Sequence, residues 1–527
     1  FNICVYLIFF CFFFFLMFFL MFFNFKLSFF FFDWSFLSLK FNFYFNSILF
    51  SFILLVVTLS VLVFSTYYLD GELNFNYYYF VLLIFVGSMF SLNFSNSVFT
   101  MLISWDILGI SSFFLVLFYN NWDSCSGAMN TVLTNRLGDF FIFFFFSFSF
   151  FSSFYFLSLS FFVCFSSLML ILTAFTKSAQ FPFSGWLPKA MSAPTPVSSL
   201  VHSSTLVTAG LILIMNFSEI VFNINISQII LLVGIFTMFF SSITALAEED
   251  MKKVVALSTL SQMGFSMLTI GLGLSFVSFT HLVSHALFKS CLFMQVGYMI
   301  HCSFGQQDGR GYNNLGNIPV FIQLQLLVTL FCLCGLFFSS GAVSKDFILE
   351  IFFSNSFMFF FCFMFFISVF FTFGYSYRLW KSFFLNFSNS VNNFSSGFVM
   401  NFLSFFLVFF SIVFLWWMNL NIMFLPSFFL YMDFFVPIFF LFFFVFVFFL
   451  NLKVMLMELI YKFSVDFLPK YSILLMKSTK FSENFFTSLN SNGFSFFSFL
   501  NFFFNSSMKG LNFNSIVIII IVLFIFF

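Results

Sequence analysis

Long apolar stretches, separated by short polar connections, make up most of this sequence. The typical stretch holds about 20 residues, which is the length at which a helix crosses roughly 30 Å of hydrocarbon. The pattern predicts about 15 such helices along the chain. We therefore expect an all-α polytopic membrane protein.

Residues 24–46 have a different pattern, in which phenylalanine and serine alternate and charged residues interrupt the apolar sequence. Alternation has the period of a β-strand and not of a helix. We therefore expect a short surface hairpin here. The preceding residues 1–23 lack a charged leading segment and a small-residue cleavage site, so we expect a spanning helix and not a signal peptide.

The stretch from Leu172 to Gly210 interrupts the succession of apolar spans. Lys177 lies where the chain should still be crossing the bilayer, and Pro182 and Pro188 prevent one helix from continuing through the region. Ionisable residues inside a membrane are costly, which makes Lys177 a functional candidate by default. The alternative is a lysine that extends from a helix end to the membrane interface.

A second interrupted segment follows later in the chain. Residues 319–336 are apolar, the sequence FFSSGAVSKD then brings Lys345 and Asp346, and the apolar pattern resumes at Phe347. Two interrupted apolar segments at corresponding places in two halves are typical of inverted repeats with a site near the breaks. We therefore expect two inverted repeats, each with a broken helix.

Other ionisable residues lie within predicted spans. Asp106 is deep in one span, where Ser104 or Ser111 could alternatively satisfy it locally. Arg136 and Asp139 are three residues apart on one helix, so an ion pair between them is sterically available. Such an ion pair is equally consistent with a structural role and with a role in proton conduction.

A stripe of three ionisable residues, His281, His285 and Lys289, occurs at intervals of four. This spacing places them on one helix face, about one turn apart, as in a proton path. Packed histidines are the alternative, and the same choice applies to His202 in VHSSTLV. Lys252 belongs to a charged cluster at a helix start, half of which the helix dipole explains.

The pattern changes again near the C-terminus. Glu458, Lys462, Asp466 and Lys470 recur every four residues and form one charged stripe on an otherwise apolar helix. Such a segment lies along the membrane and does not cross it, which predicts a lateral amphipathic helix over residues 453–510.

Composition agrees with the membrane class and limits the chemistry. Hydrophobic residues make up 62% of the chain and charged residues 7%, which leaves too little polar surface for a water-soluble globule. The nine cysteines show no CxxC pair and no ligand spacing with histidine, so we expect no metal site, iron–sulfur cluster or disulfide framework. The net charge of +1 gives no reason to expect nucleic acid. The 117 phenylalanines suggest an AT-rich organellar genome.

Several motifs together resemble one family. LPKAMSAPTPVSSLVHSSTLVTAG, preceded by KSAQF, resembles the core of the chain 5 family, the antiporter-like subunits of mitochondrial NADH:ubiquinone oxidoreductase (respiratory complex I). NRLGD, DMKKVVALSTLSQMG, HLVSHALFKSCLFM and VSKD match as well, so the resemblance covers roughly residues 97–350. The sequence PTPVSSLVHSSTLV distinguishes chain 5 from the related chains 2 and 4.

The resemblance implies roles for individual residues. Asp106 and Lys177 match the family's carboxylate and lysine pair, Lys289 its central lysine, and Lys345 with Asp346 its terminal lysine site. The family usually has Glu at the position of Asp106, so the contact with Lys177 is expected to be longer or bridged by water. The candidate residues for proton translocation are Asp106, Lys177, His202, Lys252, His281, His285, Lys289, Lys345 and Asp346, with Arg136 and Asp139 as a possible supporting ion pair.

As a family expectation, the chain is a proton-translocating subunit driven by quinone reduction elsewhere in the complex. No cofactor is expected in this chain, because NADH, FMN, iron–sulfur clusters and ubiquinone belong to other subunits. The expected partners are other membrane-arm subunits, especially neighbouring antiporter-like subunits along residues 453–510, and lipids such as cardiolipin. The expected location is the mitochondrial inner membrane. The alternatives are a multi-subunit cation/proton antiporter and a membrane-arm scaffold that conducts nothing.

The resemblance also suggests a domain organisation. We expect N-terminal transmembrane helices with the hairpin over residues 1–96, an antiporter-like core over 97–380 and C-terminal transmembrane helices over 381–452. The lateral helix over 453–510 and a final anchor over 511–527 follow. The part before Asp106 is about one helix shorter than in the family, so we expect that helix to be absent or supplied by another polypeptide.

Overall fold

The fold is known from a computed structural model, which describes residues 27–34, 37–154, 159–218, 224–312, 320–335, 340–341, 344–345, 348, 359–384 and 407–412. The chain divides into two units, Phe1–Phe446 and Val447–Phe527, and all described residues belong to the first. The predicted first span, the lateral helix over 453–510, the final anchor and Asp346 lie outside the described residues.

Two antiparallel strands form the predicted hairpin near the N-terminus. Strand β1 (Leu27–Trp34) pairs with β2 (Leu37–Phe43), with Leu27 opposite Phe43 and an irregular register between Phe30 and Phe32. The alternation of the sequence therefore predicted this element correctly.

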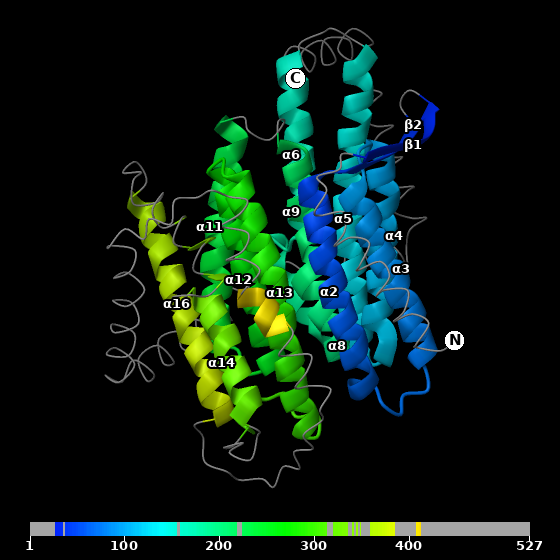
Figure 1. The fold of residues 1–527 in the computed structure, drawn as a ribbon. Coiled ribbons are helices and arrows are strands. Elements are labelled where there is room, and N and C mark those ends of the chain that lie inside the picture. Colours follow the sequence, from blue (N-terminus) through cyan, green and yellow to red (C-terminus); the bar gives the residue numbers. More distant parts are fainter. Residues whose placement is uncertain are drawn as a thin grey trace, which may run out of the picture. The chain divides into compact units, whose positions relative to one another are not determined.

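The described residues are otherwise mainly helical (Figure 1). Seven helices among them are long and apolar enough to cross a membrane, which confirms the polytopic all-α class. The total of about 15 spans stays a prediction. The longer helices are α2 (Phe45–Tyr68), α3 (Phe75–Phe94), α4 (Val98–Val116), α5 (Trp122–Phe154), α6 (Leu159–Lys177), α11 (Ile224–Ala247), α12 (Met251–Gly271), α13 (Ser275–Cys302), α14 (Val320–Cys334) and α16 (Phe359–Phe384).

The first predicted interruption is present. Helix α6 ends at Lys177, and short helical turns over 183–192 lead to α8 (Thr195–Leu200). A π-helical turn, η4 (Val201–Thr205), then joins α8 to α9 (Leu206–Asn216). Proline has no backbone N–H and clashes with the preceding turn, which explains why one helix cannot run through this region.

The second predicted interruption is present as well. Helix α14 ends at Cys334, and Gly335 follows with a φ of 75°, a left-handed conformation that glycine adopts without strain. Helical backbone recurs at residues 340–341 and 344–345. A Cβ on Gly341 would lie 1.9 Å from the carbonyl oxygen of Cys332, so the two sides of the break approach closely.

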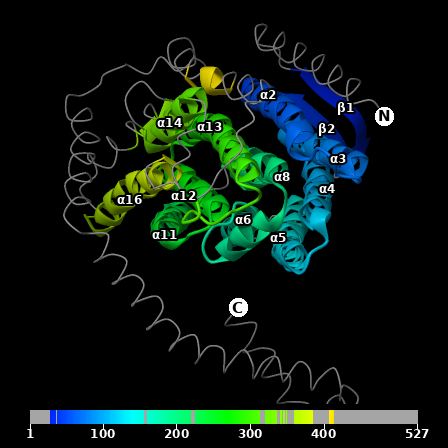
Figure 2. The ribbon, with the colours of Figure 1, turned by 90° about the horizontal axis from the view of Figure 1, so that it is seen from below.

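Helices on both sides surround the interrupted segments. Figure 1 and Figure 2 show α11, α14 and α16 on one side and α3 and α4 on the other, with α6, α8 and α13 between them. Arg378 of α16 donates to the carbonyl oxygens of Ala245, Leu246 and Glu248 and so caps the C-terminal end of α11. Because helices lie on both sides of α13, its middle is deep inside the described bundle.

A small ion-pair cluster holds two polar loops together outside the spans. Arg310 lies 2.6 Å from Glu249 and 2.8 Å from Asp308, and the backbone N–H of Gly309 donates to the carbonyl oxygen of Glu249. Hydrogen bonds from Arg310 lower the pKa of Asp308 from its usual value. The connection between α11 and α12 is thereby tied to the loop that follows α13.

Candidate proton-conducting site

Lys177 is fully buried at the last residue of α6. Its Nζ donates to the carbonyl oxygen of Trp105 over 2.7 Å and lies 3.7 Å from the centroid of the Trp105 ring. The aromatic face attracts the ammonium, and the carbonyl accepts one of its protons. The side chain therefore does not extend to a membrane interface.

Arg136 contacts two carboxylates near Lys177. Its Nη1 lies 3.1 Å from Asp139 and 3.8 Å from Asp106. The Asp139 side chain is 9% exposed and that of Asp106 is 39% exposed, so Asp106 is not as deeply enclosed as its place in an apolar span suggests. No direct ion pair joins Asp106 to Lys177 among the described residues.

His202 and Lys252 form the next part of the site. His202 lies in the π-helical turn, is 1% exposed, and has its ring 5.9 Å from that of Trp186. The Trp186 Nε1 donates to the carbonyl oxygen of Thr176, which precedes Lys177, so Trp186 bridges the two candidates. Lys252 points inward, is 3% exposed and donates to the carbonyl oxygen of Ala193.

The stripe on α13 is buried along its whole length. His281, His285 and Lys289 are each 1% exposed or less. The His281 Nδ1 lies 2.9 Å from the hydroxyl of Ser344, and the Lys289 Nζ donates to the hydroxyl of Ser258 over 2.5 Å. The stripe thus connects the second interruption to α12.

Lys345 lies at the second interruption and is 3% exposed. Its Nζ donates to the carbonyl oxygen of Leu333 over 2.5 Å, and Ser344, which directly precedes it, contacts His281. The structure therefore gathers His281, His285, Lys289 and Lys345 into one cluster.

Several buried ring nitrogens have no hydrogen-bond partner among the described residues. They are both nitrogens of His202, both of His285 and the Nε2 of His281. Buried polar groups in proteins are normally satisfied by protein atoms or by ordered water. These positions are accordingly where we expect ordered water along the line of candidates.

Sequence reasoning missed the two tryptophans near Lys177 and the two serines, Ser258 and Ser344, that contact the α13 stripe. Trp186 directly precedes the LPKAMSAP motif in the interrupted stretch, but nothing in its spacing indicates a contact with His202. Trp105 precedes Asp106 directly, yet it contacts Lys177 across 72 residues of sequence. Among the described residues, no three His, Cys, Asp or Glu side chains gather as a metal site.

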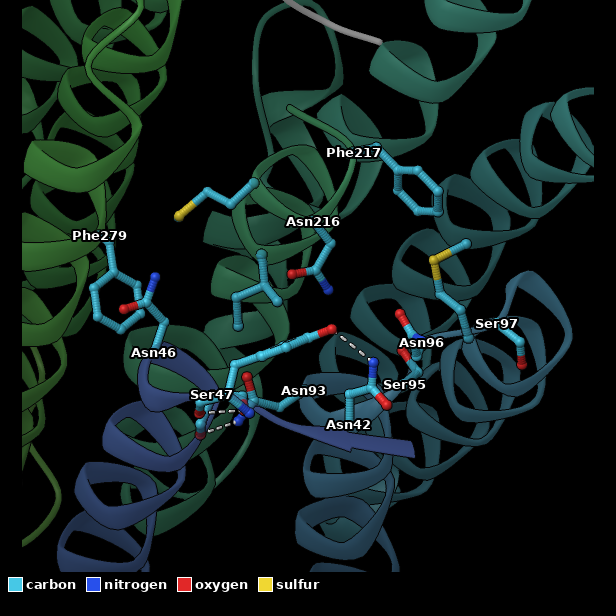
Figure 3. A pocket seen from close by; sticks show the side chains of 14 residues that line it. Asn42, Asn46, Ser47, Asn93, Ser95, Asn96, Ser97, Asn216, Phe217 and Phe279 are labelled. Carbon is cyan, nitrogen blue, oxygen red and sulfur yellow. Dashed lines mark hydrogen bonds between the residues drawn. The ribbon is translucent and has the colours of Figure 1, made fainter. Parts of the chain in front are cut away.

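A separate pocket of about 330 Å³ opens where β2 meets α2, α4 and α9 (Figure 3). Its polar lining consists of neutral side chains, and none of the candidate residues belongs to it. The polar lining residues are Asn42, Tyr44, Asn46, Ser47, Asn93, Ser95, Asn96, Ser97 and Asn216. We therefore do not include this pocket in the proton-conducting site.

The family model and the curated sequences that this chain matches all concern NADH:quinone oxidoreductase subunits. Residues 95–372 match the family model described as NADH:quinone oxidoreductase/Mrp antiporter, TM. The chain is 70% identical to NADH-ubiquinone oxidoreductase chain 5 of Caenorhabditis elegans over 523 residues, which cover 99% of each chain. Identity to the chain 5 of Ascaris suum is also 70%, over 95% of this chain and 91% of that one.

Two solved structures have a similar fold. One is the Mrp complex of a Dietzia species, with a TM-score of 0.64 and 22% identity over 79% of this chain and 54% of that chain. The other is the membrane-bound sulfane sulfur reductase, an archaeal respiratory membrane complex, with a TM-score of 0.67 and 18% identity over 76% and 70%. At these identities the likeness supports the antiporter-like fold alone.

Proposed function

This chain belongs to the chain 5 family of NADH-ubiquinone oxidoreductase, and from this premise we propose that its buried ionisable side chains form the path along which it moves protons. It is a proton-translocating membrane subunit of that enzyme, within an antiporter-like fold. The route taken by the proton is the part that we propose.

One observation carries the proposed path. Four lysines, Lys177, Lys252, Lys289 and Lys345, are 3% exposed or less, and each donates to a neutral oxygen. A buried ammonium is costly in a membrane protein, and such residues serve ion and proton pathways. Architecture alone would gain from apolar replacements at these positions, which argues against a pure scaffold.

We propose that Arg136 controls loading at Lys177. Desolvation disfavours the charged form of a lysine, and a nearby carboxylate favours it. When Arg136 turns to Asp106, the uncompensated charge of Asp139 favours a proton on Lys177. When Arg136 pairs with Asp139, that support is lost and the proton leaves past Trp186 toward His202.

The later steps use the stripe on α13. The proton passes from the His202 and Lys252 region to His281, His285 and Lys289 in turn, and then to Lys345 at the second interruption. Asp346 follows Lys345 directly in the sequence and completes the proposed terminal site. Against a membrane potential, each proton costs about 2.3 kcal/mol per 100 mV. We propose that quinone reduction in other subunits supplies this energy, and that those subunits hold the NADH, FMN, iron–sulfur and ubiquinone sites.

We further propose the surroundings of the chain. Its partners are the neighbouring antiporter-like subunits of the membrane arm, contacted through residues 453–510, together with lipids such as cardiolipin. The membrane is then the mitochondrial inner membrane. A free-standing cation/proton antiporter has the same fold class, but the identity of 70% to chain 5 proteins over almost the whole sequence favours the respiratory enzyme.

The test is a Lys177→Met substitution in the assembled enzyme. Methionine keeps much of the side-chain volume but cannot hold a proton, so the number of protons moved per electron should fall. Lys189→Met, twelve residues further along and partly exposed, is the control and should keep the normal ratio. A normal ratio for Lys177→Met with intact assembly would exclude this path.

A further inference from the structure

The step from Lys289 to Lys345 has no assigned carrier in the proposed path, on which this inference rests. The two lysines belong to different elements, and their Nζ atoms donate to different partners, the Ser258 hydroxyl and the Leu333 carbonyl. Two charged ammonium groups also repel each other, so direct contact between them is unfavourable. A polar group between them is therefore needed.

On the side of Lys289, helix α12 presents two hydroxyls. Ser258 accepts from the Lys289 Nζ over 2.5 Å, and Ser261 follows three residues later on the same helix face. The Ser261 hydroxyl lies 3.2 Å from the hydroxyl of Tyr375 on α16. The Ser261 hydroxyl also donates to the backbone carbonyl oxygen of Ser258, so Ser258 and Ser261 lie between Lys289 and Tyr375.

On the side of Lys345, helix α14 contacts Ser376, the residue that follows Tyr375 on α16. The Cys334 Sγ lies 3.0 Å from the hydroxyl of Ser376, and Cys334 directly follows Leu333, whose carbonyl accepts from Lys345. Residues 375 and 376 therefore contact both the α12 side and the α14 side of this region.

Tyr375 is an unusual choice for a packing position. It is fully buried in an otherwise apolar cluster with Leu257, Phe288 and Leu333. The chain contains 117 phenylalanines, and phenylalanine would fill the same space without the cost of burying a hydroxyl. Tyrosine differs from phenylalanine only by its hydroxyl, so the hydroxyl is the feature of Tyr375 that needs a function.

We propose that the Tyr375 hydroxyl bridges Lys289 and Lys345 in the proton path. Ser258 and Ser261 extend the bridge toward Lys289, and water spans the remaining gaps toward Lys345. The Lys289 ammonium gives up a proton, each hydroxyl oxygen gains one proton as it releases its own, and the neutral Lys345 amine accepts the last one. Every hydroxyl ends neutral, so no other reactant is required.

The test compares Tyr375→Phe with Tyr377→Phe in the assembled enzyme. Both substitutions remove one hydroxyl from α16, but Tyr377 is 37% exposed and serves as the control. Removing a group that transfers protons should slow NADH-driven proton pumping by roughly tenfold or more. Ser261→Ala removes the hydrogen-bond partner of Tyr375 and should slow pumping in the same direction. Normal pumping by Tyr375→Phe in an intact complex would overturn the proposal.

A parallel Lys289→Met variant separates this inference from the proposed function. If Lys289→Met blocks pumping and Tyr375→Phe does not, the bridge is wrong and the path through the lysines stands. If Lys289→Met pumps normally, the path itself fails. Should Tyr375→Phe impair assembly, the Ser261→Ala variant alone decides, because it removes the hydroxyl that contacts Tyr375 and leaves Tyr375 itself in place.

Discussion

Arg136 lies between two carboxylates that differ in burial, and this difference should determine what each contributes. Asp139 is nearly enclosed and accepts from Arg136 over 3.1 Å, whereas Asp106 is partly exposed and lies 3.8 Å away. The closer contact is a charged hydrogen bond, which is stronger than the more distant contact with Asp106. Asp139 should therefore be the carboxylate that compensates more of the local positive charge.

We expect Asp139→Asn to destabilise the complex more than Asp106→Asn. Losing a charged hydrogen-bond partner at a mostly buried site costs about 1–3 kcal/mol, and a partly exposed ion pair contributes about 0–1 kcal/mol. Thermal unfolding and proton pumping of the two assembled variants would measure the difference. Equal effects, or a larger effect of Asp106→Asn, would contradict this reading of Arg136.

The sequence predicted which ionisable residues are candidates, because they interrupt apolar runs. It did not predict which residues contact them. A lysine in an apolar run and three ionisable residues at intervals of four indicate Lys177 and the α13 stripe directly. The contact between Ser261 and Tyr375 joins positions 114 residues apart, so no local pattern could predict it. The 39% exposure of the Asp106 side chain was not predictable for the same reason, because an apolar neighbourhood in sequence does not say which face of a helix the bundle covers.

At the scale of elements, α11 and α12 pack through glycines. A Cβ on Gly234 would lie 2.8 Å from the backbone nitrogen of Leu268, and one on Gly264 would lie 2.8 Å from that of Met238. Small residues at helix contacts in membranes let the backbones approach closely. This contact positions α12, which carries both Lys252 and Ser258.

We expect Gly234→Ala to destabilise the complex by about 1–3 kcal/mol, because backbone atoms of the facing helix cannot give way as a flexible side chain can. Gly109→Ala in α4 is the matched control, since nothing lies within 4 Å of a Cβ there. That change should be neutral or stabilise by up to about 1 kcal/mol. Thermal unfolding of the two assembled variants would decide, and equal stability would refute the close packing of α11 on α12.

The elements that the sequence predicted well are those with a strong local cause. Proline placed the first interruption, alternation placed the hairpin, and continuous apolar runs placed the spans. The π-helical turn at Val201–Thr205 was not predictable, because its residues suit an ordinary helix equally well. Packing between distant helices, which the local pattern does not record, decides such details.

At the scale of the whole molecule, the two interrupted segments and the buried α13 place buried polar and ionisable residues within an apolar bundle. The described residues contain four buried lysines. Two of them lie at an interruption, and the other two lie on helices that pack next to an interruption. A membrane protein tolerates irregular backbone where it is enclosed by protein or lines a hydrated space. The architecture thus supports the proposed proton path.

The most direct test of this account is the number of protons moved per electron by the assembled enzyme with Lys289→Met. Lys253→Met is the control, because Lys253 is partly exposed and pairs with Asp250 at the surface. We predict a lower ratio for Lys289→Met and a normal ratio for Lys253→Met, with both complexes assembled. A normal ratio for Lys289→Met would contradict the buried path.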